Sequence, residues 1–192
     1  MNTKLWLWIV ALSLLAGCAP LSGKCSPRPV IVPTLPALIP SYAELDQSTG
    51  LHITGTYQQI DLETWRLRVT GKVDQALALS YDDLRCMPKM KSLETIICRG
   101  NFEDSDTWAG VPLIHILTLA GVQADATQIQ LRGADGYSST VLLKDALSEI
   151  NFLAYEWRGQ AVPILHGFPV RAAFPALPGY TWVKWLVEIE VK

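Results

Sequence analysis

His166-Gly167-Phe168-Pro169-Val170-Arg171 begins the C-terminal part of this 192-residue chain, and Phe174-Pro175, Pro178-Gly179-Tyr180 and Trp182-Val183-Lys184-Trp185 follow it. An arginine can fork onto the oxygens of a phosphate and a lysine can add a point charge, so Arg171 and Lys184 suit an anionic ligand. Gly167 and Gly179 would let the backbone approach that ligand closely. The alternative is that both cations are surface charges at strand ends and that His166 lies in a turn.

Two stretches further upstream complete the pattern, Ile97-Cys98-Arg99-Gly100 and Trp108-Ala109-Gly110-Val111-Pro112-Leu113. We expect Ile96 and Ile97 to bury the end of a strand, and the residues from Arg99 to Asn101 to open a turn that presents the Cys98 thiol to a cavity. A thiolate is a soft anionic ligand that suits a heavy metal. The alternative is an inert buried cysteine.

Together these motifs resemble the sulfite-oxidase-type molybdopterin-binding domain, and the resemblance extends from about Trp65 to the end of the chain. It implies an α+β fold of mixed β-sheets with short helices, in a single domain around a molybdenum–molybdopterin cofactor. It also implies that Cys98 is the catalytic molybdenum ligand. The residues that it places around the cofactor are His166, Arg171, Trp182, Val183 and Lys184, with Gly133 and His52 as looser matches. Arg99 either binds an anionic substrate or is solvated.

Hydrophobic periodicity and turn signals predict the same fold class without the resemblance. Ser80 is placed as the N-cap of a short helix that ends before Pro88, and Pro112 and Gly121 bracket a second helix. Trp108 and Trp185 are read as core aromatics and His115 as structural or exposed. The remaining expected elements are strands at 65–71, 92–98, 152–157 and 183–191, a hairpin of 127–131 with 137–143, and a helix at 144–150.

The N-terminus predicts export and a lipid anchor. Residues 1–17 have a basic start at Lys4, a short apolar run and the ending Leu15-Ala16-Gly17-Cys18, which resembles a bacterial lipoprotein signal that is cleaved before a lipidated Cys18. The apolar run is too short to span a bilayer comfortably. Ala19 after the cysteine favours the outer membrane, with the protein on the periplasmic, extracytoplasmic side. A plain secretory signal is the alternative.

Residues 18–50 are rich in proline, which predicts an extended tether, and residues 51–192 form the domain. In an oxidising compartment Cys25 could pair with Cys86, but their separation along the chain does not say how close they lie.

The resemblance implies a two-electron oxo-transfer on a small substrate, possibly one that contains sulfur. The sequence has no haem or iron–sulfur ligand motif, so a separate cytochrome or quinone-linked partner would carry the electrons. The net charge of −2 gives no indication of nucleic-acid binding. The alternative is a non-catalytic envelope lipoprotein that uses the same fold to bind a ligand or a partner, which the absence of a twin-arginine pair near Lys4 favours.

Overall fold

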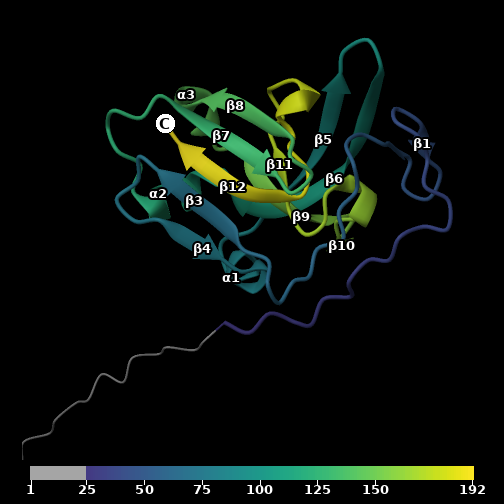
Figure 1. Cartoon of the computed structure of the whole chain (residues 1–192), viewed down its shortest axis with the longest axis horizontal. Helices are drawn as coiled ribbons and strands as arrows, with labels where there is room; N and C mark the ends of the chain where they lie inside the picture. Colours follow the sequence, from purple (N-terminus) through teal and green to yellow (C-terminus); the bar gives the residue numbers. More distant parts are fainter. Residues whose placement is uncertain (1–24) are drawn as a thin grey trace, which may run out of the picture.

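The computed structural model describes residues 25–192, and within them two five-stranded sheets and a small hairpin make up the fold (Figure 1). The predicted signal peptide and the predicted lipidation site, Cys18, lie outside the described residues. The first sheet has the order β4 (Leu77–Leu79), β3 (Leu67–Gly71), β12 (Leu186–Val191), β7 (Gln128–Gly133), β8 (Ser138–Leu142). The second has the order β10 (Gln160–Ala161), β9 (Phe152–Trp157), β6 (Phe102–Pro112), β5 (Met90–Cys98), and β11 (Arg171–Ala173) also pairs with β9.

Both sheets are mostly antiparallel, but β12 pairs in parallel with β3 and antiparallel with β7. The predicted class, an α+β domain of mixed sheets with short helices, is confirmed. Strand β9 is buried from Phe152 to Tyr155, as expected for a strand between two packed layers, and Trp108 and Trp185 are core residues as predicted. His115 is half-buried on a helix.

The helices are short: α1 (Tyr81–Arg85), α2 (Leu113–Ala120), α3 (Leu143–Ala146) and the 3-10 turns η1 (Ile164–His166) and η2 (Gly179–Thr181). Ser80 caps α1 through a reciprocal capping box with Asp83, and Gly121 ends α2 in the left-handed region at φ 68°, as the sequence predicts. Helix α3 stops at 146 rather than 150 because the Asn151 amide donates to the carbonyls of Asp145 and Ala146. Strand β12 begins at 186 rather than 183 because Trp185 is left-handed, with φ 47°.

Strands β5 and β6 form a long hairpin that projects on the right in Figure 1. Side chains of successive strand residues point to opposite faces. Ile96 is therefore buried, whereas Ile97, which we expected to be buried as well, is 43% exposed. Cys98 ends β5, and Gly100 is left-handed with φ 80° in the turn that follows.

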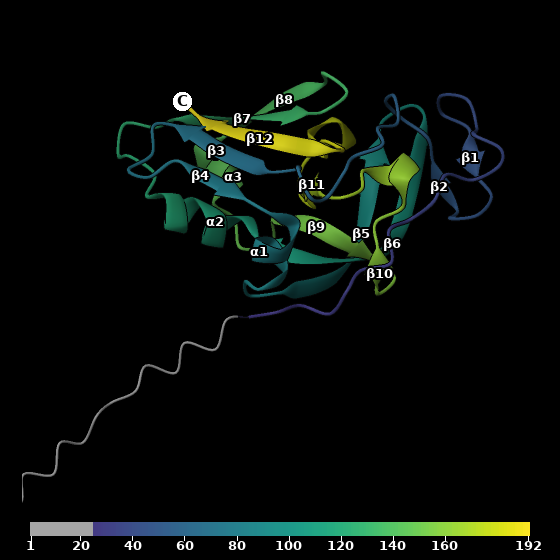
Figure 2. The ribbon, with the colours of Figure 1, turned by 60° about the horizontal axis from the view of Figure 1, so that its bottom comes forward.

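The N-terminal segment runs along the body of the domain before it folds into the small hairpin of β1 (Leu45–Asp46) and β2 (Leu51–His52) (Figure 2). Residues 25–40 contain no helix or strand. The hairpin packs beside β6, and Asp46 and Thr49 within it are buried. Residues 41–50, which we assigned to the tether, thus pack against the domain, because polar side chains of this stretch bond to groups inside it. No helix in residues 25–192 is long and apolar enough to cross a membrane.

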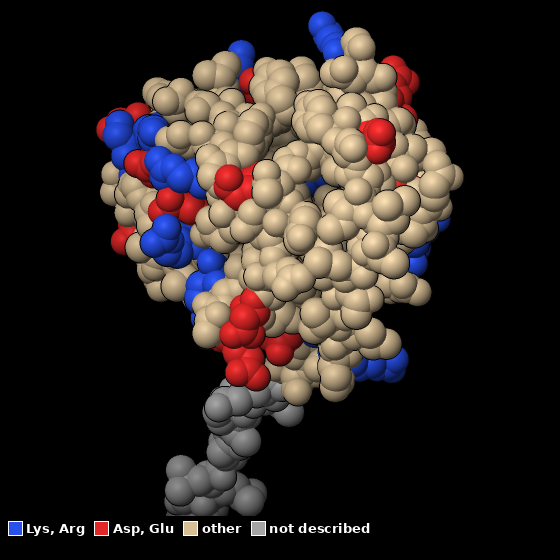
Figure 3. All heavy atoms as spheres, turned by 45° about the vertical axis from the view of Figure 1, so that its right-hand side comes forward, with Lys and Arg blue, Asp and Glu red and all other residues tan. Residues whose placement is uncertain are grey.

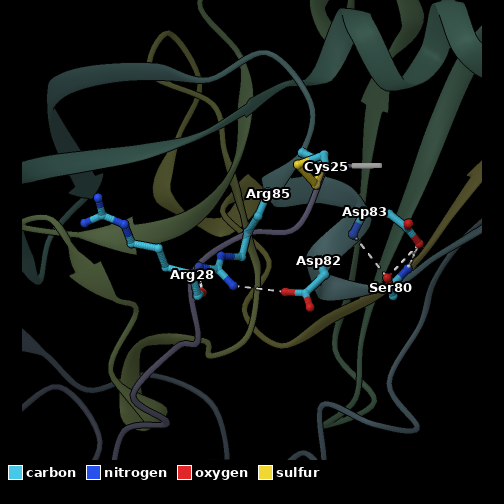
Figure 4. The surroundings of a disulfide bond; sticks show 7 residues. Cys25, Arg28, Ser80, Asp82, Asp83 and Arg85 are labelled. Carbon is cyan, nitrogen blue, oxygen red and sulfur yellow. Dashed lines mark hydrogen bonds and ion pairs between the residues drawn. A yellow bond between two sulfur atoms is a disulfide. The ribbon is translucent and has the colours of Figure 1, made fainter. Parts of the chain in front are cut away.

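A disulfide attaches the start of the described chain to helix α1 (Figure 4). Cys25 and Cys86 are bonded, with their Cα atoms 5.8 Å apart, so the pairing that the sequence left open is present. Next to it, Arg85 donates to the carbonyl of Arg28 at 2.6 Å and to the carboxylate of Asp82 at 2.9 Å. The extended segment is therefore held at α1 by one covalent bond and one hydrogen bond.

We predict that the double substitution Cys25→Ser with Cys86→Ser lowers the free energy of unfolding by about 2–4 kcal/mol, because the bond closes a long loop in the unfolded chain. Urea unfolding followed by tryptophan fluorescence measures the change. Cys98→Ser, which removes the free thiol instead, is the control. An unchanged urea midpoint in the double variant would refute the prediction.

Candidate active site

The Cys98 thiol lies at the end of β5 and opens onto a cavity of about 670 Å³. Aromatic side chains from several elements line this cavity, among them Tyr42, Tyr137, Tyr180 and Trp185. The middle of the face shown in Figure 3 carries few charged side chains, which gather instead at its left edge and at the bottom. The turn after Cys98 brings Arg99 to the cavity, as predicted, where the side chain is exposed.

A second, small cavity of about 30 Å³ lies deeper, and six residues line both spaces: Thr54, Cys98, Phe102, Gly179, Trp182 and Lys184. His52, His166 and Arg171 line only the deeper space. The sulfur and the predicted cationic residues are thus brought to one place. Gly179 makes this possible, since a Cβ atom there would lie 2.7 Å from the Cys98 sulfur.

Arg171 is a buried cation whose hydrogen bonds are incomplete. Its two terminal nitrogens donate to the carbonyls of His166 at 3.2 Å and Trp182 at 3.4 Å, but its Nε has no partner. The guanidinium carbon lies 4.9 Å from the ring centre of Trp108. Burial lowers the pKa of Arg171 to about 10, and the nearby Asp104 and Cys98 offset part of this effect.

Lys184 adds a second buried positive group. Its ammonium donates to the carbonyls of Thr54 and Leu165, both at 3.0 Å. Burial lowers the pKa of Lys184, and the charge of Arg171 lowers it further. Within residues 25–192 no carboxylate lies within salt-bridge distance of Lys184 or Arg171. Burying a cation without an ionic partner costs several kcal/mol, so Arg171 and Lys184 suit an anion that enters the small cavity, which we call the slot.

His166 is buried in η1, and its Nε2 contacts Thr49 Oγ1 at 2.9 Å and Asp46 Oδ2 at 3.1 Å. Burial and the charge of Lys184 lower its pKa to about 3, although the hydrogen bond to Asp46 opposes the shift. The imidazole is therefore neutral at physiological pH.

His52, at the end of β2, also lines the small cavity. Its Nδ1 is 2.7 Å from Asp104 Oδ1, and its ring stacks on Phe102 with the ring centres 4.3 Å apart. Burial raises the pKa of the Cys98 thiol, and Asp104 raises it further, while Arg171 and Lys184 act in the opposite direction. Without a bound cation, Cys98 is therefore a thiol at neutral pH.

The remaining predicted residues, Val183 and Gly133, are not in the lining of either cavity. Val183 is buried in the core. Gly133 ends β7, where a Cβ atom would lie 2.6 Å from the carbonyl of Lys184. The sequence analysis missed Asp46, Thr49, Thr54 and Asp104, of which the first three come from the N-terminal segment and bond across more than a hundred residues.

The arrangement is that of a molybdopterin-binding oxidoreductase domain. The family model described as "Oxidoreductase molybdopterin binding domain" matches residues 54–192, so the chain belongs to this family. The predicted family and the predicted cofactor, molybdenum–molybdopterin, are confirmed by this match.

The chain is similar to several known proteins. The uncharacterized oxidoreductase YuiH of Bacillus subtilis is 34% identical, over 68% of this chain and 66% of the relative. Human mitochondrial sulfite oxidase is 33% identical, over 69% of this chain and 30% of the relative. The crystal structure of the sulfane dehydrogenase SoxCD from Paracoccus pantotrophus has the same fold, with a TM-score of 0.67 at 22% identity over 70% of this chain and 40% of that chain. The chain thus spans two thirds or less of the length of these relatives.

The residues present fit a molybdopterin. The orphaned Arg171 Nε and the ammonium of Lys184, which has no carboxylate partner in residues 25–192, suit its phosphate. Cys98 offers a sulfur ligand at the junction of the two spaces.

The burial of His166 predicts a pH dependence of stability. Its pKa in the folded chain, about 3, lies below the ordinary value of 6.5, so between these values the unfolded chain binds a proton that the folded chain does not. The free energy of unfolding should fall by about 1 kcal/mol per unit as the pH drops from 6.5 towards 4.

This slope should be smaller in His166→Gln and unchanged in His115→Gln, a half-buried histidine that lines neither cavity. Urea unfolding at several pH values between 6.5 and 4 measures it. Equal slopes in the wild type and His166→Gln would contradict the pKa shift.

Proposed function

We propose that this protein is a membrane-anchored, molybdopterin-dependent oxidoreductase that carries out a two-electron oxo-transfer on a small substrate. The observation that carries the proposal is the position of Cys98, whose sulfur opens onto a large cavity and adjoins the slot that holds Arg171 and Lys184. A metal ligand and an anion site that meet in this way suit one cofactor that carries both a metal and a phosphate.

When bound, the cofactor supplies the redox change and the exchange of an oxygen atom. The protein holds and orients it: the Cys98 thiolate would ligate the metal, Arg171 and Lys184 would bind the phosphate, and the buried slot would exclude water. Because Asp104 and burial favour the protonated thiol, Cys98 must lose its proton when the metal binds.

The outer part of the larger cavity is where a substrate would enter. Its lining is largely aromatic and apolar, with Arg99 as a cation at the turn after Cys98. The relatives include a sulfite oxidase and a sulfane dehydrogenase, whose names refer to sulfur compounds, which supports a small sulfur-containing substrate. Electrons would pass to a separate cytochrome or quinone-linked partner.

The proposed location is the extracytoplasmic side of a membrane, in the periplasm, with a lipid on Cys18. The Cys25–Cys86 disulfide supports export, since disulfides persist in oxidising compartments. The lipoprotein signal of residues 1–18 supports the anchor.

We predict that the wild-type chain, extracted from membranes of a host that makes molybdopterin, contains about one molybdenum per chain and that Cys98→Ser loses most of it. Serine keeps the size of the side chain but replaces a soft sulfur ligand by a neutral hydroxyl. Metal analysis of the purified proteins measures the content, and Cys25→Ser with Cys86→Ser is the control that keeps Cys98. Folded wild-type protein without molybdenum would instead support the non-catalytic binding module.

We also predict that Cys18→Ser releases the protein from the membrane fraction, because the acyl chains would supply most of its membrane affinity. Fractionation of cells followed by immunoblotting measures the distribution. Wild-type protein in the soluble fraction would refute the anchor and leave the metal prediction intact.

A further inference from the structure

The β1–β2 hairpin contributes to the cofactor slot from outside the matched family region, which begins at residue 54. Asp46 and Thr49 of the hairpin contact the buried ring of His166. With two residues in each strand, such a hairpin is not stable by itself. Its contacts with the slot therefore hold it in place.

The carboxylate of Asp46 is fixed by several donors. Its Oδ1 accepts from the backbone N–H of Ser48 at 2.9 Å and from the Ser48 hydroxyl at 2.7 Å. Its Oδ2 lies 3.0 Å from the Thr49 hydroxyl and 3.1 Å from His166 Nε2. Burial alone would raise the pKa of Asp46, but the hydrogen bonds from Ser48, His166 and Thr49 outweigh burial and lower it. Asp46 is therefore an ionised carboxylate.

An ionised carboxylate can only accept hydrogen bonds, so the Nε2 atom of His166 must carry a proton to bond to Asp46. The ring as a whole is neutral, because burial and the charges of Lys184 and Arg171 oppose a second proton. A neutral imidazole with a proton on Nε2 has an unprotonated Nδ1, which is a hydrogen-bond acceptor.

We propose that Asp46 is a positioning residue that holds His166 as the Nε2–H tautomer and leaves Nδ1 as an acceptor for an N–H or O–H group of the bound molybdopterin. His166 would then bind a donor of the cofactor, while the phosphate oxygens, which are acceptors, fall to Arg171 and Lys184. The β1–β2 hairpin supplies no lysine or arginine to the slot, but through Asp46 it would make the Nδ1 atom of His166 a hydrogen-bond acceptor there.

Residues 61–64 offer a matched control within the same chain. Asp61 accepts from the backbone N–H of Glu63 at 3.0 Å and lies 3.1 Å from the hydroxyl of Thr64, the same local turn that Asp46 makes with Ser48 and Thr49. This turn is exposed and contacts no histidine. Asp61→Ala therefore removes a similar local turn without touching His166.

The tautomer is measured by ¹⁵N–¹H correlation spectroscopy of the imidazole rings in the full chain, purified free of cofactor from a host that cannot make molybdopterin. The chain has three histidines, so His166 can be assigned by substitution. We expect the Nε2–H form in the wild type and in Asp61→Ala, and a mixture of tautomers in Asp46→Ala. Asp46→Asn should keep the Nε2–H form, because its amide oxygen can still accept.

Two results would overturn the proposal: an Nδ1–H ring in the wild type, or an unchanged tautomer in Asp46→Ala. The wild-type spectrum decides the first without any variant, so the test holds even if Asp46→Ala fails to fold.

A second readout is the retention of molybdopterin after dialysis of protein from a host that makes it. We expect Asp46→Ala to bind about tenfold more weakly, by analogy with residues that orient metal-binding histidines, and Asp46→Asn to bind more tightly than Asp46→Ala. This arm rests on the proposed function, whereas the tautomer arm does not. Wild-type protein that never binds molybdopterin would refute the function, and equal retention in Asp46→Ala and Asp61→Ala would refute the role of Asp46.

Discussion

Two buried cations without a carboxylate partner impose the main constraint on this structure. Arg171 and Lys184 are held by backbone carbonyls of Leu165, His166, Trp182 and Thr54. Such carbonyls must point inwards, which a regular strand between two neighbours does not allow because its carbonyls pair within the sheet. The 3-10 turn η1 supplies the carbonyls of Leu165 and His166, and Trp182 directly follows the 3-10 turn η2. Binding of an anion, as proposed for the phosphate of the cofactor, would offset part of the cost of burying both charges.

The same constraint explains where the thiol lies. Cys98 ends strand β5, and the neighbouring strand β6 carries Asp104. Gly179, the first residue of η2, lies against the Cys98 sulfur. The cations favour the thiolate, whereas burial and Asp104 favour the thiol. The charges of Arg171, Lys184 and Asp104 therefore all act on the Cys98 sulfur. A metal ion bound to Cys98 would in turn change the electrostatic environment of these three residues. The proposed metal ligand, Cys98, and the proposed phosphate-binding residue Lys184 both line the two cavities, so a cofactor bound there would be in contact with the whole group.

The sequence predicted those features of the structure that depend on local patterns. The β5 strand with its turn and the bracketed helix α2 follow from neighbouring residues, whereas the grouping of His166, Arg171 and Lys184 was implied by the resemblance to the family. Contacts between distant segments were not predictable, because a proline-rich stretch gives no sign that Asp46 and Thr49 meet a histidine more than a hundred residues away. The exposure of Ile97 was missed for a related reason: the β5–β6 hairpin projects from the core, and only the pleat of the strand distinguishes Ile97 from Ile96.

The N-terminal segment consequently connects two fixed points. Its start is bonded to α1 through Cys25, and its end bonds to the slot through Asp46, Thr49 and Thr54. A chain held at both ends has lost much of the conformational entropy that would oppose docking of its middle. The weak two-residue strands of the hairpin can therefore remain in place, and the contacts of Asp46 and Thr49 with His166 are buried, where hydrogen bonds are stronger. The part of the chain that looks least structured in the sequence thus completes the most polar part of the interior.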